Sequence, residues 1–437
     1  MRFKKWEELY GCKVFLTTSE LQQFQRTCFY QQEKRNIKIR NPFQSEVCQR
    51  CFGQIQKHWY YPETKIKYCW HCKEMGTIRS NDHLIILIDP KRYTNMERIN
   101  WKGHLTASQQ KIADEHLLAW DQRRHHLTYA VTGAGKTEML YPLINRALGL
   151  QKRIALVAPR IDVVLELARR IEKNFSGEFL ILHGNQHHIK YNQLVICTIQ
   201  QLMKFHQTFD LIIVDEVDAF PLIDNSALKR VIEMAREKDG VIHYLSATPT
   251  NKLLKEVGHA QGKVSFLAKR YHGHPLPKIK IKFTRNWRKK LPRTLNRELL
   301  KYQKNKRYFL IFVPQITDLS LVSAMLPKSL HVKTVYANDQ QRSDTIEMFR
   351  RGELHGLIAT TILERGVTFS PLDVYILGGE ERIFTYETIL QMAGRCGRSA
   401  DFPTGNVWIF AKDFSFKMYR AQQEIIFLNR IGVQNEM

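Results

Sequence analysis

One segment of the chain, residues 130–137, constrains the fold more than any other. It reads Ala-Val-Thr-Gly-Ala-Gly-Lys-Thr and stands between an apolar run and an amphipathic stretch. Glycines at such a strand-to-helix turn let backbone amides converge on phosphate groups at a helix N-terminus. The expected nucleotide-binding positions are Thr132, Gly133, Ala134, Gly135, Lys136 and Thr137. Lys136 would reach the β and γ phosphates, and Thr137 would ligate Mg²⁺. Ala130 replaces the first glycine of the usual pattern and leaves its Gly-Lys-Thr core intact.

An acidic segment, residues 215–218, follows another apolar run 79 residues after Lys136 and reads Asp-Glu-Val-Asp. A carboxylate at the carboxyl end of a buried strand is where a P-loop enzyme holds its magnesium ion. We expect Asp215 to hold Mg²⁺ through water and Glu216 to act as general base on the attacking water. Together the two segments predict a site that hydrolyses a nucleoside triphosphate.

Short apolar runs alternate with amphipathic stretches from residue 105 onward, which is typical of βαβ units with a parallel sheet. The first series of expected strands is 127–131, 154–158, 179–182, 194–197, 211–214 and 241–245, with helices such as 163–171 and 226–237. The second series is 308–313, 332–336, 356–359, 374–377 and 406–410, and a separate strand is expected at 84–88. We therefore expect two similar α/β units, with their boundary between residues 263 and 300.

Four of the eight cysteines form two Cys-x-x-Cys pairs with seventeen residues between the pairs. These are Cys48, Cys51, Cys69 and Cys72. Two residues between thiols let one tight turn direct both sulfurs to a single point, so the pattern predicts a structural zinc ribbon. Disulfides are the alternative, but a reducing cytosol disfavours them. Four thiolates leave no open position for a catalytic water.

The chain carries a net charge of +25, and much of this charge is concentrated between residues 263 and 310. That segment holds sixteen lysines and arginines and one acid, Glu298. Such a concentration attracts polyanions, and nucleic acid is the favoured partner. Three aromatic residues stand among these lysines and arginines: Trp287, Tyr302 and Tyr308. Such an arrangement suits stacking on unpaired nucleobases. A solvated linker and a surface for anionic lipid headgroups are the alternatives.

The motifs between about residues 105 and 400 resemble those of superfamily-2 helicases and translocases, in the expected order. The resemblance implies an α/β fold of two tandem RecA-like P-loop domains that bind ATP and Mg²⁺ and grip a nucleic-acid strand. We expect an N-terminal domain at 1–104, with its ribbon at about 45–76. The first RecA-like domain is expected at 105–265 and the second, with a basic entry segment, at 266–437.

In the first RecA-like domain, the resemblance assigns roles to four short motifs. Gln109, in Leu-Thr-Ala-Ser-Gln, corresponds to an adenine contact. The residues that correspond to DNA-backbone contacts are Arg160, Thr198 and Gln200. Ser246 and Thr248, in Ser-Ala-Thr-Pro, correspond to the residues that couple hydrolysis to domain movement, through hydrogen bonds to Asp218.

In the second domain, residues 359–366 resemble a motif that touches both strand and ribose, which implies DNA contact by Thr361 and nucleotide contact by Gly366. Thr368 stands where many relatives carry Asp or Asn, so a ribose contact at that position does not carry over. The last motif, residues 391–398, implies catalytic roles for Gln391, Arg395 and Arg398. The arginines would neutralise charge on the transferring phosphoryl group when the two domains close.

Within this superfamily the chain resembles ComFA, a family of DNA-stimulated ATPases that act late in natural competence. The resemblance rests on the four cysteines ahead of the motor, on Asp-Glu-Val-Asp-Ala-Phe-Pro at 215–221, and on the phrase at 360–369. It implies an ATP-dependent single-stranded DNA translocase or helicase that drives uptake of transforming DNA. Competence proteins at the inner membrane face would be its partners.

Three other functions remain open from the sequence. The primosomal replication-restart helicase shares the Leu-Thr-x-x-Gln and Val-Thr-Gly-x-Gly-Lys-Thr phrases, although it places its zinc cysteines within the motor. A zinc-dependent DNA-binding adaptor would use nucleotide only as a clamp. An RNA-remodelling relative is disfavoured by Asp-Glu-Val-Asp at 215–218.

We expect a cytoplasmic protein with peripheral contact at the inner face of the membrane. No apolar run approaches the roughly 20 residues that span a bilayer, and the N-terminus lacks the apolar core of a secretory signal.

Overall fold

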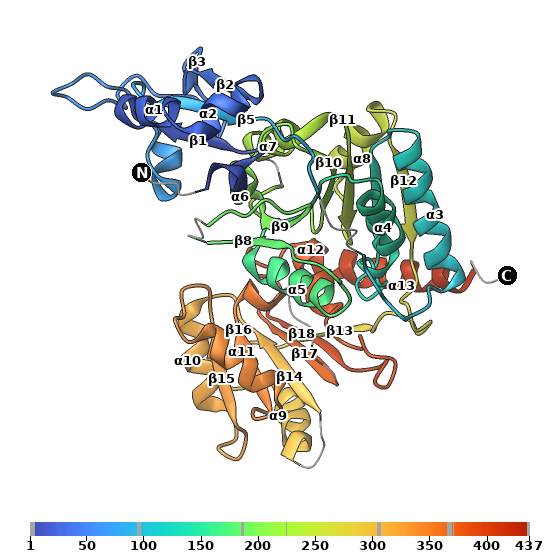
Figure 1. Ribbon diagram of the computed structural model, residues 1–437. Helices are drawn as coiled ribbons and strands as arrows, with labels where there is room; N and C mark the ends of the chain where they lie inside the picture. The colour runs from blue at the N-terminus through green and yellow to red at the C-terminus, as the bar shows by residue number, and fades with distance from the viewer. Residues whose placement is uncertain are drawn as a thin grey trace. The chain divides into compact units, whose positions relative to one another are not determined.

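Two parallel β-sheets organise the computed structural model (Figure 1). The structure describes residues 5–93, 98–184, 188–223, 225–303, 307–364, 369 and 371–434. The chain divides into two compact units, and each is considered by itself. The first unit comprises Met1–Tyr129 and Thr137–Ser265, and the second comprises Ala130–Lys136 and Phe266–Met437.

The larger sheet has seven strands in the order β12-β6-β11-β10-β7-β9-β8. The strands are β6 (His126–Ala130), β7 (Ile154–Ala158), β8 (Leu180–Leu182), β9 (Leu194–Thr198), β10 (Phe209–Val214), β11 (Arg236–Ser246) and β12 (Lys263–Leu267). From β6 through β11, β10, β7 and β9 to β8, neighbouring strands are parallel. This confirms the six strands expected from the apolar runs, and β12 is an additional strand.

Helices cover both faces of this sheet. The helices are α3 (Ala107–Asp121), α4 (Tyr141–Gly149), α5 (Ile161–Glu172), α6 (Ile199–Leu202), α7 (Ser226–Ala235) and α8 (Asn251–His259). Apolar residues of α4 and α5 pack on one face, against Leu156, Ile196 and Ile213. Those of α6, α7 and α8 pack on the other face, which carries Val157, Cys197 and Val214. Alternation along each strand therefore fills two cores, as expected for a doubly covered parallel sheet.

The expected helix at 226–237 ends two residues early. Its last residue is Ala235, and Arg236 already begins β11. The Arg236 side chain donates to the carbonyl of Gly240, and a Cβ at Gly240 would lie 2.7 Å from the carbonyl of Phe209. The close approach of β10 thus draws the polar segment 236–240 into the sheet, against its weak strand propensity.

The second unit contains a six-stranded sheet in the order β13-β18-β17-β14-β16-β15, and all its neighbouring strands are parallel. The strands are β13 (Ile279–Phe283), β14 (Tyr308–Phe312), β15 (Val332–Val335), β16 (Gly356–Ala359), β17 (Leu372–Leu377) and β18 (Val407–Ala411). The helices are α9 (Arg293–Leu299), α10 (Ile316–Met325), α11 (Arg342–Arg350), α12 (Tyr386–Ala393) and α13 (Phe416–Gln434). The five strands expected for this half are confirmed.

A small antiparallel sheet, β1-β5-β2, lies near the N-terminus (Figure 1). Its strands are β1 (Lys13–Leu16), β2 (Ile37–Arg40) and β5 (His83–Leu87), and the helices α1 (Thr18–Gln25) and α2 (Cys28–Glu33) follow β1. Trp6, Phe24, Phe29 and Ile85 belong to the same hydrophobic core as the β9 and β10 face of the larger sheet. The predicted division into domains at 1–104, 105–265 and 266–437 stays a prediction.

A buried ion pair joins this N-terminal module to the larger sheet. Arg153 is fully buried, and one Nη lies 3.1 Å from a carboxylate oxygen of Asp89. The same guanidinium donates to the carbonyl of Tyr10 at 2.8 Å, and Asp89 also accepts from the hydroxyl of Thr208 at 2.8 Å. The Arg153 charge and these hydrogen bonds outweigh burial and hold the pKa of Asp89 below its usual value. The pair therefore stays ionised at neutral pH.

Three buried histidines form a second polar group inside the first unit. Nδ1 of His116 lies 2.8 Å from Nδ1 of His243, and Nε2 of His116 lies 2.9 Å from Oγ1 of Thr128. Thr128 Oγ1 is 3.4 Å from Nδ1 of His126, whose Nε2 lies 2.8 Å from Ser265 Oγ. Ser265 donates to Glu115 on α3.

The geometry of the histidines fits a shared proton better than a metal ion. Their ligand atoms lie within 4.8 Å of one another. However, two imidazoles on a tetrahedral zinc ion at Zn–N of about 2.05 Å would hold their nitrogens roughly 3.3 Å apart. The 2.8 Å between the Nδ1 atoms is a hydrogen-bond length. The group is therefore a continuous series of hydrogen bonds that runs from His243 to Glu115.

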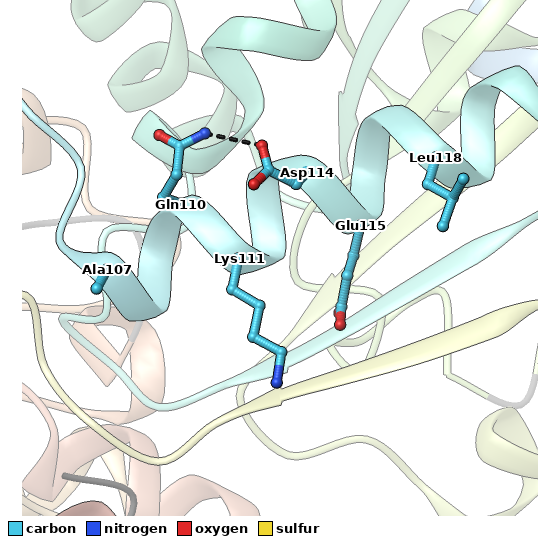
Figure 2. Close-up of a pocket in the computed structure, with 6 residues that line it drawn as sticks. All are labelled: Ala107, Gln110, Lys111, Asp114, Glu115 and Leu118. Atoms are coloured by element: carbon cyan, nitrogen blue, oxygen red, sulfur yellow. Dashed lines mark hydrogen bonds between the residues drawn. The ribbon is translucent and has the colours of Figure 1, made fainter.

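One direction of donation satisfies this series. Ser265 donates to a carboxylate oxygen of Glu115, so its own oxygen accepts from Nε2–H of His126. With neutral imidazoles, Thr128 then donates to Nδ1 of His126 and accepts from Nε2–H of His116, and Nδ1–H of His243 donates to Nδ1 of His116. Among the described residues of this series, only Nε2 of His243 is left without a partner. Figure 2 shows Glu115, the last residue of this series, on α3, where it points to the same side as Lys111, whereas Gln110 and Asp114 share a hydrogen bond on the other side. These residues line a shallow hollow along α3.

Replacing Asp89 by Asn should lower the free energy of unfolding by about 3–5 kcal/mol, because it leaves the Arg153 charge buried and unpaired. Asp121→Asn is a matched control, since its pair with Arg146 is about half exposed on both sides and should contribute less than about 1 kcal/mol. Urea unfolding measures both. Equal small losses in the two variants would show that the buried pair contributes no more than a surface pair.

Acid should destabilise the first unit through the histidines. Burial lowers the pKa of His126 to about 4 and holds the pKa values of His116 and His243 well below 6.5. Because the unfolded chain binds these protons near pH 6.5, stability is fully present above that pH and falls as the pH drops toward 4. His126 alone should account for about 2 kcal/mol between pH 7 and pH 5. Unfolding measured against pH should show a shallower slope in His126→Asn than in the wild type, and an unchanged slope in the exposed control His274→Asn. Identical slopes in all three proteins would refute the assignment.

Candidate functional site

The phosphate loop leaves the carboxyl end of β6 with two residues in the left-handed region. Gly133 has φ +81° and Gly135 has φ +77°, conformations that glycine adopts without strain. The amine of Lys136 donates to the carbonyl of Ala130 at 3.1 Å. Ala130 is fully buried, so the missing first glycine stands at a packed strand end. A short 3₁₀ turn, Glu138–Leu140, follows the loop and leads into α4.

The loop fits the phosphates that its sequence predicts. Two positive-φ glycines within three residues bend the backbone into a cradle, which backbone amides can line. Thr132, Ala134 and Thr137 are buried. Lys136 and Thr137 are the groups that would hold the phosphates and Mg²⁺, and these roles stay predictions.

The acidic motif begins where β10 ends. The amide of Asp215 donates to the carbonyl of Val157, which keeps the motif in line with β7. The Glu216 amide donates to Oδ1 of Asp215 at 2.8 Å, and Glu216 has φ +52°. A positive φ is strained for glutamate, and such strain is typical of functional turns. The positive φ of Glu216 turns the backbone sharply directly after Asp215, the residue predicted to hold Mg²⁺.

Asp218 links the acidic motif to the segment that follows β11. Ser246 Oγ donates to Oδ1 of Asp218 at 2.6 Å, and Thr248 Oγ1 donates to Oδ2 at 2.8 Å. Both carboxylate oxygens are thus engaged, and all three side chains are buried. The predicted partner of the two hydroxyls is therefore the observed one. Their role in coupling hydrolysis to movement is not tested by this geometry.

The sheet order explains why these motifs belong together. β6, β11 and β10 are neighbouring parallel strands, so their carboxyl ends lie at one edge of the sheet. The phosphate loop, the Ser246 segment and the acidic motif follow these three strands in turn. Ligands of open parallel sheets bind at that edge.

The other first-domain predictions occupy helix starts. Thr106 caps α3 and its amide donates to Oε1 of Gln109 at 2.8 Å, so the predicted adenine contact is also part of a capping box. Arg160 is the N-cap of α5, and Thr198 is the N-cap of α6, which contains Gln200. β7 and β9 are parallel neighbours, so both helix starts lie at the same sheet edge. DNA contact by these residues stays a prediction.

In the second unit, the last motif lies against the turn after β16. Gln391 is buried on α12, and Arg395 is buried with Nε donating to the carbonyl of Glu364 at 2.9 Å. Arg398 Nε donates to the carbonyl of Gly394 at 2.9 Å. Thr361 begins the 3₁₀ segment Thr361–Glu364. The predicted nucleotide contact Gly366 and the variant position Thr368 lie outside the described residues.

Arg270 was not predicted as a site residue. The structure places it beside the phosphate loop and the last motif, both of which belong to the second unit. It is buried, and Nε donates to the carbonyl of Thr132 at 3.2 Å. One Nη donates to the carbonyl of Gly397, and burial lowers the pKa of the guanidinium to about 10. No motif surrounds Arg270 in the sequence, so only its position in the basic segment could have drawn attention to it.

The basic segment is partly neutralised within its own unit. Arg288 lies 2.7 Å from Asp318, and Arg307 lies 2.8 Å from Asp373. Trp287 is buried in the core, and Tyr302 is buried with its hydroxyl donating to Asp373. The expectation that Trp287 and Tyr302 stack on nucleobases is therefore wrong, because packing against the sheet covers both rings.

The four predicted zinc ligands form one buried cluster. Cys48 Sγ lies 3.8 Å from Cys72 Sγ, and Cys51 Sγ lies 3.5 Å from Cys69 Sγ. A tetrahedral zinc ion with Zn–S of about 2.3 Å requires sulfurs roughly 3.8 Å apart. The Gly53 amide points to Cys51 Sγ at 3.4 Å, and such a hydrogen bond stabilises a thiolate. The arrangement is compatible with zinc.

The search for membrane spans adds one finding. Among the described residues, no helix combines the length and apolar character that crossing a bilayer requires.

Two family models match the chain. Residues 102–251 match the res subunit of type III restriction enzymes, and residues 290–400 match the helicase conserved C-terminal domain. Solved structures with similar folds include the DEAD-box helicase Mss116 bound to single-stranded RNA, with a TM-score of 0.56 at 17% identity over 74% of this chain and 78% of that chain. Mycobacterium smegmatis helicase Lhr, bound to single-stranded DNA, gives 0.54 at 15% identity over 76% of this chain and 50% of that one. At these identities the likeness shows the fold alone: two RecA-like domains.

Relatives of known name are much closer in sequence. The chain is 36% identical to competence protein ComFA of Streptococcus pneumoniae over 391 residues, which cover 88% of this chain and 90% of that protein. It is 34% identical to ComFA of Bacillus subtilis over 403 residues, covering 89% and 87%. Together with the helicase fold and the four-cysteine cluster, this similarity shows that the chain belongs to the ComFA family of competence proteins.

Proposed function

We propose that this helicase-like ATPase of competence is a translocase that pulls single-stranded DNA into the cell, with hydrolysis stimulated by the strand. The observation that carries the proposal is the row of motifs at the ends of β6, β11 and β10. It supplies a phosphate cradle, a carboxylate for Mg²⁺ and a hydrogen-bonded connection to the next motif in one sheet edge.

The chain's own residues divide the work as follows. Lys136 balances the phosphate charge, and Thr137 and Asp215 would hold Mg²⁺, which supplies electrostatic stabilisation of the transferring phosphoryl group. Glu216 accepts a proton from the attacking water. Arg395 and Arg398 neutralise the charge that develops in the transition state. The shared Asp218 carboxylate transmits a change at the acidic motif to Ser246 and Thr248.

A nucleotide clamp without turnover is the rival reading, and the hydrogen bonds at Asp218 argue against it. A clamp has no need for a carboxylate whose two oxygens connect the hydrolytic motif to the following strand. DNA grip by Arg160, Thr198, Gln200 and Thr361, and nucleotide contact by Gln109 and Gly366, remain part of the proposal. So do membrane-associated competence partners and a peripheral position at the inner membrane face.

Phosphate release measured with and without an unstructured oligothymidylate tests the proposal. We expect DNA to stimulate phosphate release by the wild type. In Lys136→Ala the rate should fall at least about a hundredfold, because the lysine charge that neutralises the phosphates is removed. Lys173→Ala, at an exposed lysine beyond α5, is the matched control and should behave as wild type. Absence of stimulation across a range of salt concentrations would refute the translocase, and preferential stimulation by polyuridylate would favour an RNA-remodelling enzyme.

Metal analysis tests the ribbon. We expect one zinc per chain, and the double variant Cys48→Ser, Cys51→Ser should lose the metal together with much of the ribbon's stability, since binding energy of a structural site is folding energy. Cys28→Ser is the control, because Cys28 is exposed and lies outside the cluster. Zinc content by mass spectrometry and protease resistance of the ribbon are the measurements. A metal-free wild type, or a double variant as protease-resistant as wild type, would contradict the structural role.

A further inference from the structure

Three aromatic rings lie in a row on the ribbon, with the half-buried Tyr68 between the exposed Tyr61 and Trp70. The ring centroids of Tyr61 and Tyr68 are 5.0 Å apart, and those of Tyr68 and Trp70 are 6.5 Å apart. Trp70 is 49% exposed and Tyr61 is 38% exposed. Rings of this size normally lose most of their surface to packing, as Trp287 does in the second unit. Tyr61 and Trp70 therefore leave a large part of their ring surface open to solvent.

The backbone of the ribbon fixes the row. Tyr68 pairs with Arg79, and its amide donates to the carbonyl of Trp59, so the segments around 60, 68 and 79 run side by side. Tyr68 is half-buried in its bridge to Arg79, and Trp70 is exposed as the first residue of the 3₁₀ segment Trp70–Met75. Cys69, between them, is fully buried in the thiol cluster. A metal ion at the cysteines would hold the two rings in place.

Cations accompany the rings. The Lys73 amine lies 4.4 Å from the Trp70 ring centroid, and the Arg79 guanidinium lies 5.6 Å from that of Tyr61. Residues 57–79 hold five lysines and arginines against two glutamates, Glu63 and Glu74. An aromatic face with a net positive margin complements a chain of unpaired bases joined by phosphates.

We propose that Tyr61, Tyr68 and Trp70 form a stacking surface for unpaired bases of single-stranded DNA, with Lys73 and Arg79 taking the adjoining phosphates. The inference rests on the proposed function and names the part of the chain that grips the strand outside the motor motifs. It also replaces the stacking role that the sequence had suggested for Trp287 and Tyr302. A protein partner on the same surface would need neither bases nor phosphates, which makes the two occupants separable.

The test compares two fluorescent oligomers on the full-length protein with zinc bound: an oligothymidylate, and an abasic oligomer with the same phosphates and no bases. The wild type should bind the oligothymidylate about five- to tenfold more tightly than the abasic strand. Trp70→Ala should lower affinity for the oligothymidylate by about the same factor and leave the abasic strand unaffected, with an unchanged salt dependence. Trp70→Phe should restore binding because it keeps a ring face. Lys73→Gln should instead reduce the slope of affinity against salt by about one phosphate contact.

Tyr419→Ala is the matched control, since this ring is 44% exposed on α13 of the second unit. Its affinity for both strands should equal that of the wild type. The inference is overturned if the wild type binds both oligomers equally, or if Trp70→Ala with full zinc content binds as wild type. Strand-independent phosphate release should be unchanged in Trp70→Ala. A wild type whose hydrolysis ignores DNA refutes the proposed function, whereas a stimulated wild type matched by Trp70→Ala in oligomer binding refutes only the stacking surface.

Discussion

The buried pair between Arg153 and Asp89 is the constraint on which the first unit depends. Arg153 stands directly before β7, and Asp89 follows β5 of the small sheet, so the pair joins two sheets of different type. The approach is so close that a Cβ at Gly11 would collide with the Arg153 guanidinium and the Thr208 hydroxyl, and Gly11 also has φ +79°. Removing one charge leaves the other buried and unpaired, which costs far more than the pair itself contributes. The pair thus disfavours arrangements of the N-terminal module on the sheet that would separate the two charges.

The arrangement of the predicted catalytic motifs at the carboxyl ends of the strands depends on the order of the strands in the larger sheet. β11 lies between β6 and β10, so the segment that carries Ser246 and Thr248 begins between the phosphate loop and the acidic motif. Both oxygens of Asp218 are held by these hydroxyls, so the carboxylate cannot shift without moving the end of β11. A buried carboxylate with two short hydrogen bonds is stiff, and stiffness is what transmits a small displacement. The strained φ of Glu216 sits two residues before this link.

The elements predicted from sequence are those that local pattern determines. Apolar runs identified the strands of both sheets except the edge strands β12 and β13, because a strand covered on both faces is apolar along its whole length whereas these two are partly exposed. The cysteine spacing identified a cluster that the structure forms. The pattern could not reveal partners far apart in the chain, such as Asp89 with Arg153 or His116 with His243, since nothing local marks them. The sequence pattern also could not separate buried from exposed aromatic residues. Trp287 and Trp70 both stand among lysines and arginines, and only tertiary packing buries Trp287.

The shared core decides what the ribbon can contribute to a motor. Two grips that move relative to one another are needed to advance a strand, and a third independent grip would work against them. The ribbon is not independent, because Phe15 and Met203 pack against its cysteine core, and Met203 and Phe52 also pack against the core of the larger sheet. Bases held on Tyr68 and Trp70 would therefore travel with the unit that carries Asp215. Under the proposed function, the ribbon would extend the first unit's contact with the strand without adding a third part that moves by itself.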